Sequence, residues 1–302
     1  MKAWMRWMLW GVGGVLLLSA GAVAWGVMRS DQRLARKITQ PAYELAVPGG
    51  DTALARGRYL FASRGCAECH GPDGAGRPFI DEPGGGLYAR SPNISPGPGS
   101  VTATYTPADW ERTVRHGIKP DGRPLLIMPS EDYSRLTDAD VGALVAYVRS
   151  LAPAAGGPAE FRLPLPVRVL YGFGVIPDAA EKIDHALPPS QPVPEGVTVE
   201  HGRYVAQMCI GCHGAGMSGG TIPGGPPDWP PSANLTPGDG SVLPRYADTA
   251  AFRRAMRTGK RPDGSAISSV MPFQTLRALN DTDLDAIRLY LQTLPPRPAG
   301  QR

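Results

Sequence analysis

The chain has 302 residues, of which 42% are hydrophobic and 19% are charged, a composition typical of globular proteins that excludes a disordered chain. The 31 basic residues nearly balance the 27 acidic ones and form no cluster, so we expect no nucleic-acid partner. The 38 glycines and 33 prolines are spread along the chain without a period, and they predict a folded protein with long loops.

Residues 1–29 contain an apolar segment that is long enough to cross a membrane. From Trp7 to Met28 there are 22 residues without a charge, and a spanning helix needs about 20. Tryptophans lie near both ends of this segment, as is typical of a membrane interface: Trp4, Trp7, Trp10 and Trp25. Ala22-Val23-Ala24 also fits the cleavage site of a signal peptide. We expect a membrane anchor, with a cleaved signal peptide as the alternative.

After a linker at residues 30–50, the chain repeats a series of short motifs. The two copies of each motif are 142 to 145 residues apart. The repeated motifs are Gly-Arg-Tyr at 57 and 202, Cys-x-x-Cys-His-Gly at 66 and 209, Pro-Asp-Gly at 120 and 262, Met-Pro at 128 and 271, and a tyrosine at 147 and 290. Repeats of this length predict two domains rather than a solenoid of short units. The domains are expected at residues 51–152 and 196–296, with a Pro-rich connector at 153–195 and a tail at 297–302.

Helix-start and helix-stop signals predict three helices in each copy. The first helices are expected at about residues 52–63 and 198–208. The second helix of the first copy begins at the N-cap Thr106 and stops at Gly117, and its counterpart stops at Gly259. The third helices begin at Thr137 and Asn280. No convincing strand alternation is present, so both domains are expected to be all-α.

The four cysteines of the chain all lie in two Cys-x-x-Cys-His motifs, which are the attachment signature of c-type haem. Two thiols one helical turn apart can each bond one porphyrin, and the adjacent histidine can bind its iron. A redox dithiol or a zinc site would also use a Cys-x-x-Cys pair. In a zinc site the second pair usually follows within about 20 residues, whereas the two pairs of this chain begin at 66 and 209. The motifs therefore predict two haem c groups, attached at Cys66, Cys69, Cys209 and Cys212 and bound axially by His70 and His213.

Methionines supply the second axial ligand in this prediction. Met128 and Met271 each precede a proline, and each lies 58 positions after the histidine of its copy. Met217 is only four positions after His213, on the same side of the ring, and Met256 falls on a helix face that predicts a core position.

The order of motifs in each copy resembles class I cytochrome c, over residues 51–152 and 196–296. The resemblance implies that Gly57 and Tyr59 contact the terminal helix near Tyr147, and that Gly202, Tyr204 and Tyr290 repeat this contact. The segments at 91–95 and 233–237 are similar to the cytochrome subunits of bacterial membrane-bound alcohol, aldehyde and gluconate dehydrogenases. Those subunits usually have three haem domains, whereas this chain has two.

A His/Met pair leaves the iron no open position, so the predicted function is electron transfer and not catalysis. The expected partners are a dehydrogenase as donor and a respiratory acceptor, either a quinone, an oxidase or another cytochrome. The expected location is the bacterial cell membrane, with the haem domains in the periplasm. The alternative is a di-haem enzyme, peroxidase-like or thiosulfate-oxidising, which needs one open haem. No signalling domain is visible that would make the chain a haem-based sensor.

Overall fold

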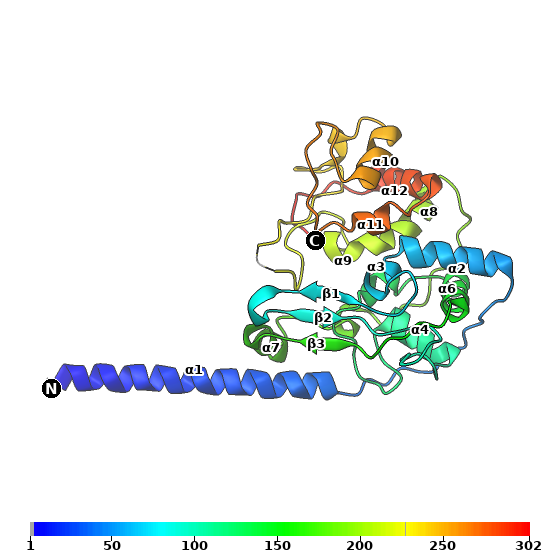
Figure 1. Ribbon diagram of the computed structural model, residues 1–302. Helices are drawn as coiled ribbons and strands as arrows, with labels where there is room; N and C mark the ends of the chain where they lie inside the picture. The colour runs from blue at the N-terminus through cyan, green and yellow to red at the C-terminus, as the bar shows by residue number, and fades with distance from the viewer. Residues whose placement is uncertain (1–2, 227) are drawn as a thin grey trace.

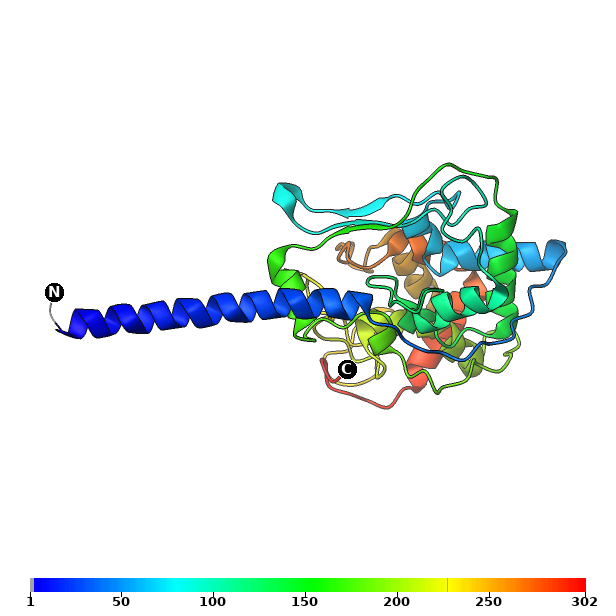
Figure 2. The same ribbon diagram turned by 90° about the horizontal axis from the view of Figure 1, so that it is seen from below.

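The computed structural model describes residues 3–226 and 228–302, so the first two residues of the expected anchor lie outside the described residues. The N-terminal helix α1 (Ala3–Ala35) projects from the body of the molecule (Figures 1 and 2). Its 33 residues correspond to about 50 Å. Among the described residues it is the helix long and apolar enough to cross a membrane. It continues beyond residue 29 into the expected linker.

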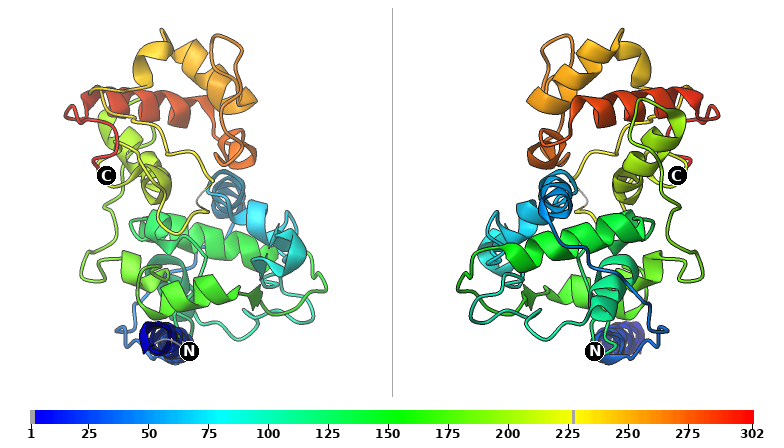
Figure 3. Two further views of the ribbon diagram at one scale, coloured as in Figure 1. Left: turned by 90° about the vertical axis from the view of Figure 1, so that its left-hand side faces the viewer. Right: turned by 90° about the vertical axis from the view of Figure 1, so that its right-hand side faces the viewer.

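The body consists of two helical domains that lie one above the other (Figure 3). Domain 1 contains α2 (Asp51–Ser63), α3 (Cys66–His70), the 3₁₀ turn η1 (Pro83–Gly85), α4 (Pro107–His116), α5 (Ser130–Tyr133) and α6 (Asp138–Ser150). Domain 2 contains α8 (Val199–Val205), η3 (Ala206–Cys209), α9 (Ile210–His213), η4 (Leu243–Arg245), α10 (Thr249–Thr258), α11 (Phe273–Leu276) and α12 (Asp281–Thr293). Its first helix is shorter than expected, because the α-helix changes to a 3₁₀ turn after Val205.

The predicted caps are present at the helix ends. The Thr106 side chain accepts a hydrogen bond from the Asp109 backbone, and the Asp109 carboxylate accepts one in return, which completes a capping box at the start of α4. Gly117 ends this helix in the left-handed region with φ 64°, and Gly259 ends α10 with φ 70°. Thr137 caps α6, and Asn280 caps α12 in the same way.

Each domain is built around a close crossing of its first and last helices. A Cβ atom on Gly57 would lie 2.0 Å from the carbonyl oxygen of Ala143 in α6 and 2.6 Å from Cβ of Tyr147. A Cβ atom on Gly202 would lie 1.9 Å from the carbonyl oxygen of Ala286 in α12. Only glycine allows backbones to approach this closely. The crossing that the resemblance implied for these glycines is therefore present in both copies.

The expectation of an all-α protein is wrong for part of domain 1. The strands β1 (Pro78–Asp81), β2 (Tyr88–Arg90) and β3 (Glu160–Arg162) form an antiparallel sheet in the order β1-β2-β3. Strands of three or four residues contain too few alternations for the sequence to indicate them. In addition, β3 comes from the connector and pairs with a strand about 70 residues earlier in the chain.

The connector is also more regular than expected. It includes β3, the helix α7 (Leu165–Gly172) and the 3₁₀ turn η2 (Ala180–Lys182). α7 packs against α1, whereas η2 packs against α5. The connector is thus held against domain 1 and the N-terminal helix.

Candidate functional site

Each Cys-x-x-Cys-His motif lies in a short helical segment: α3 contains the whole first motif, whereas in the second motif Cys209 ends the 3₁₀ turn η3 and α9 begins at Ile210. In α3, Gly65 precedes Cys66 in the left-handed region, and Gly71 follows His70 with φ 78°. Gly214 follows His213 with the same φ, 78°. The two thiols of each motif are therefore one helical turn apart, as attachment to a single porphyrin requires. In the chain without haem, burial raises the pKa of the Cys66 thiol to about 12.

The histidine side chains are oriented to bind a metal through Nε2. Nδ1 of His70 lies 3.0 Å from the carbonyl oxygen of Pro92, and Nδ1 of His213 lies 2.9 Å from that of Ala233. A carbonyl only accepts hydrogen bonds, so Nδ1 carries the proton and Nε2 keeps its lone pair. Burial lowers the pKa of both histidines, which favours the neutral imidazole. A partly buried, neutral imidazole with a fixed tautomer fits an axial haem ligand.

A loop that the sequence analysis did not assign to the site holds each histidine in place. Ser91 donates to the carbonyl of Cys69 at 2.6 Å, and Ser232 donates to that of Cys212 at 2.7 Å. The amide of Asn93 donates to the carbonyls of Pro98 and Ala154, at 3.1 and 2.9 Å. Asn234 makes the equivalent two bonds in domain 2. The repeated Ser-x-Asn pattern could have indicated this loop, because each residue between Ser and Asn supplies the carbonyl for its histidine.

The two predicted methionine ligands lie at equivalent points of the two domains. Met128 and Met271 are partly buried against the hydrophobic core, and each lies in the loop directly before α5 or α11. The carbonyl of each accepts a hydrogen bond from the amide two residues later, at 2.8 and 2.9 Å. Met256 is 7% exposed and lies in the core, as its helix position predicts. Met217 is 1% exposed, in a left-handed conformation with φ 57°.

The zinc alternative finds no geometric support. In the described parts of the chain, no group of three or more histidine, cysteine or carboxylate side chains is arranged to hold a metal ion. The thiols, the imidazoles and the loops around them fit two separate haem groups instead.

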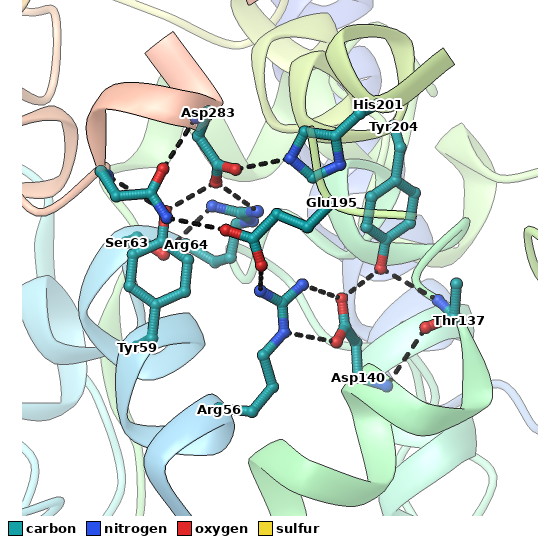
Figure 4. A network of polar contacts seen from close by, with 11 residues as sticks. Arg56, Tyr59, Ser63, Arg64, Thr137, Asp140, Glu195, His201, Tyr204 and Asp283 are labelled. Atoms are coloured by element: carbon teal, nitrogen blue, oxygen red, sulfur yellow. Dashed lines mark hydrogen bonds and ion pairs between the residues drawn. The ribbon is translucent and has the colours of Figure 1, made fainter. Parts of the chain in front are cut away.

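The two domains are joined by a reciprocal pair of tyrosines (Figure 4). Tyr59 of domain 1 donates to Asp283 of α12 at 2.6 Å and accepts from the Asn280 amide at 3.2 Å. Tyr204 of domain 2 donates to Asp140 of α6 at 2.5 Å and accepts from the Thr137 amide at 3.2 Å. Each tyrosine therefore binds the N-terminus of the last helix of the other domain. The resemblance placed both tyrosines near the last helix of their own domain, and it did not indicate that their hydroxyl groups bind the other domain.

The two aspartates that receive these hydroxyl groups are charged. Burial by itself would raise the pKa of Asp140, but the bidentate contact with Arg56, at 2.8 and 2.9 Å, outweighs burial and lowers it. At Asp283, burial is outweighed by the charge of Arg64 and by hydrogen bonds from Tyr59 and His201, so this pKa is lowered too. Arg64 is 4% exposed and reaches Asp283 from the other domain, at 3.3 Å. The interface thus contains buried carboxylates with full sets of partners.

The attachment helices themselves lie at this interface. α5 of domain 1 contacts α9 and η3 of domain 2, and α11 of domain 2 contacts α2 and α3 of domain 1. Asp132 of α5 accepts a hydrogen bond from the Gly211 amide at 2.9 Å. Thr275 of α11 donates to the carboxylate of Glu68 at 2.6 Å. Each haem-attachment motif is therefore in direct contact with the other domain.

Comparison with known proteins identifies both copies. Residues 52–148 match the family described as "Cytochrome C oxidase, cbb3-type, subunit III", and residues 199–295 match "Cytochrome c". The fructose dehydrogenase cytochrome subunit of Gluconobacter japonicus is 28% identical over 287 residues, which are 85% of this chain and 56% of that protein. The cytochrome c subunit of alcohol dehydrogenase (quinone) from Gluconacetobacter polyoxogenes is 30% identical over 84% of this chain and 58% of that protein.

The chain spans less than two thirds of the length of these dehydrogenase subunits. It covers 97% of a "diheme cytochrome c-type" protein of Cereibacter sphaeroides, at 27% identity over 94% of its own length. The chain therefore contains two tandem cytochrome c domains, at residues 52–148 and 199–295, and carries two covalently bound haem c groups.

Proposed function

We propose that the chain is a two-haem electron relay, which accepts electrons one at a time from a dehydrogenase and passes them to a respiratory acceptor. The observation that carries the proposal is the contact between the attachment helices of each domain and the other domain, at α3 with α11 and α9 with α5. Rates of electron transfer fall with distance, so two redox groups at a shared interface suit a relay within one chain. When bound, each haem supplies an iron that cycles between ferric and ferrous states.

The residues of the chain have separate tasks in this proposal. Cys66 and Cys69 form the thioether bonds of the first haem, and His70 and Met128 bind its iron. The second haem is held by the equivalent residues, Cys209, Cys212, His213 and Met271. The carbonyls of Pro92 and Ala233 fix the histidine tautomers, as the distances of 3.0 and 2.9 Å support.

The dehydrogenase partner is proposed from the relatives, which are named as subunits of fructose and alcohol dehydrogenases. We further propose that α1 anchors the chain in the bacterial cell membrane and that the haem domains lie in the periplasm. The length and composition of α1 and its projection from the body support the anchor (Figure 1). Deleting residues 3–29 behind a cleavable signal peptide should move the haem protein from the membrane to the soluble fraction.

Binding of carbon monoxide tests the ligand assignment. The reduced unmodified protein should bind almost none, because both irons are capped on both sides. Met128→Ala and Met271→Ala should each open one site, and each variant should bind about one equivalent per chain. Met256→Ala is the matched control, because this side chain lies in the core on α10, and it should bind none.

If one haem of the unmodified protein binds carbon monoxide readily, its iron has an open position, and the di-haem enzyme then replaces the relay. The equal 58-position spacing of histidine and methionine in both copies supports the relay.

A further inference from the structure

The helix α7 and the N-terminal helix α1 touch through glycine. A Cβ atom on Gly172 would lie 1.9 Å from the carbonyl oxygen of Gly26. A Cβ atom on Gly26 would lie 3.0 Å from both the Phe173 ring and the Val169 side chain. Glycine on both sides lets the two backbones come into contact. The end of α7 is therefore held beside α1 at the level of Gly26.

This contact lies across the boundary between the apolar and the charged parts of α1. Arg29 is the first charged residue after the apolar stretch, and Gly26 lies three positions before it. At a rise of about 1.5 Å per residue, Gly26 is about 4–5 Å inside the apolar part. On the charged side, Arg168 of α7 pairs with Asp31 at 2.7 Å. Arg168 of α7 thus lies beside the charged part of α1, and Phe173, directly after α7, lies beside the apolar part.

The end of α7 exposes apolar side chains, and Phe173 among them lies at the level of Gly26. Leu170 is 41% exposed, Phe173 is 51% exposed and Val175 is 64% exposed; we call these three residues the α7 apolar turn. On α1 itself, Trp25 is 54% exposed one position before Gly26. Figures 1 and 2 show that α7 lies on the side of the body from which α1 projects.

We propose that the α7 apolar turn inserts into the interfacial layer of the bilayer that α1 crosses. The proposal rests on the proposed membrane anchor. Lipid is the expected partner because Phe173, at the centre of the turn, packs against Gly26 in the apolar part of α1, a few ångströms before its first charge. An apolar residue at that level meets lipid rather than water.

A second point of insertion restricts how the haem domains move. A body attached through one helix can rotate about the axis of that helix. With both α1 and the α7 apolar turn in the membrane, one side of the body faces the lipid. The connector is also tied to the chain directly after α1, because Arg36 binds Asp178 through two hydrogen bonds of 2.5 and 2.9 Å.

Site-directed spin labelling of the full-length haem protein tests this arrangement in vesicles of phosphatidylethanolamine and phosphatidylglycerol. The four native cysteines are consumed by haem attachment, so Phe173→Cys introduces a single reactive thiol. The label at 173 should lose access to a water-soluble nickel complex severalfold relative to a label at Val197→Cys. Val197 is the matched control: it is 53% exposed against 51% for Phe173, and it precedes α8 on the far side of the body (Figure 1). Val175→Cys should behave like Phe173→Cys and replaces it if that variant does not fold.

A label at Leu17→Cys, in the middle of the apolar part of α1, separates the two proposals. If the label at 17 is protected while those at 173 and 175 are as accessible as the one at 197, the α7 proposal is overturned and the anchor stands. If the label at 17 is also accessible to the nickel complex, α1 does not span the bilayer, and both proposals are overturned.

Discussion

Replacing Tyr204 with phenylalanine should weaken the contact between the two haem domains. The hydroxyl group of Tyr204 donates to the Asp140 carboxylate at 2.5 Å and accepts from the Thr137 amide at 3.2 Å. A hydrogen bond to a charged group contributes about 1.5–3 kcal/mol to stability. Tyr204→Phe keeps the ring, so we expect the free energy of unfolding to fall by about 1.5–3 kcal/mol.

The reciprocal bond predicts a similar loss for Tyr59→Phe. The double variant Tyr59→Phe/Tyr204→Phe should lose about 3–6 kcal/mol, provided that the two sites are independent. With both bonds removed, the domains should unfold in separate transitions. Urea unfolding of the haem protein, followed by haem absorbance and by far-ultraviolet circular dichroism, measures both effects.

Tyr290→Phe is the matched control for this experiment. Tyr290 is a partly buried tyrosine of α12, and its hydroxyl group makes no hydrogen bond to the residues that the structure describes. The reasoning is refuted if Tyr59→Phe and Tyr204→Phe change the free energy of unfolding no more than Tyr290→Phe does.

The same tyrosines predict an alkaline effect. Burial and the nearby aspartates raise the pKa of Tyr59 and Tyr204 to about 12, from an ordinary value of 10.0. Because the folded pKa is higher than the unfolded one, the stabilisation is complete below about pH 10 and is lost as the pH rises through about 12. For Tyr204, which is 8% exposed, the loss is about 3 kcal/mol. The double phenylalanine variant should lack this part of the pH dependence.

Three further outcomes are expected. Stability should also fall in acid, because the pKa values of Asp140 and Asp283 are lowered in the folded state. Their contribution to stability is present above about pH 4 and is lost as the pH falls through the folded pKa values. Replacing both aspartates with asparagine should remove this pH dependence in urea unfolding. Gly57→Ala and Gly202→Ala should lower the thermal midpoint and the yield of haem protein, because the new Cβ atom would lie 2.0 or 1.9 Å from a carbonyl oxygen. Overpacking of this kind costs about 1–3 kcal/mol. Gly49→Ala is the control: its Cβ atom meets no atom within 4 Å, so this variant should match the unmodified protein. Cys69→Ala should leave the first haem attached by a single thioether and reduce its recovery on a denaturing gel stained for haem, and unchanged recovery would contradict its assignment as an attachment residue.

The features that the sequence determined are local ones. Thr106, Thr137 and Asn280 cap helices because a side-chain oxygen can reach an amide two or three residues later, whatever the rest of the chain does. The two thiols of a Cys-x-x-Cys-His motif likewise lie within one helical turn of each other. The repeat of these motifs was enough to predict two domains, and the haem groups and the crossing glycines followed from the family resemblance.

The tertiary structure decided the features that depend on distant partners. Asp140 and Asp283 occupy ordinary positions in the first turns of their helices, and nothing local indicates that a tyrosine of the other domain binds each of them. The strand β3 exists because it pairs with β2, and three residues alone have no strand preference strong enough to predict it. α7 is held in place by its contact with Gly26, almost 150 residues earlier in the chain. Contacts of this kind depend on how the folded domains meet, and the local sequence pattern does not contain that information.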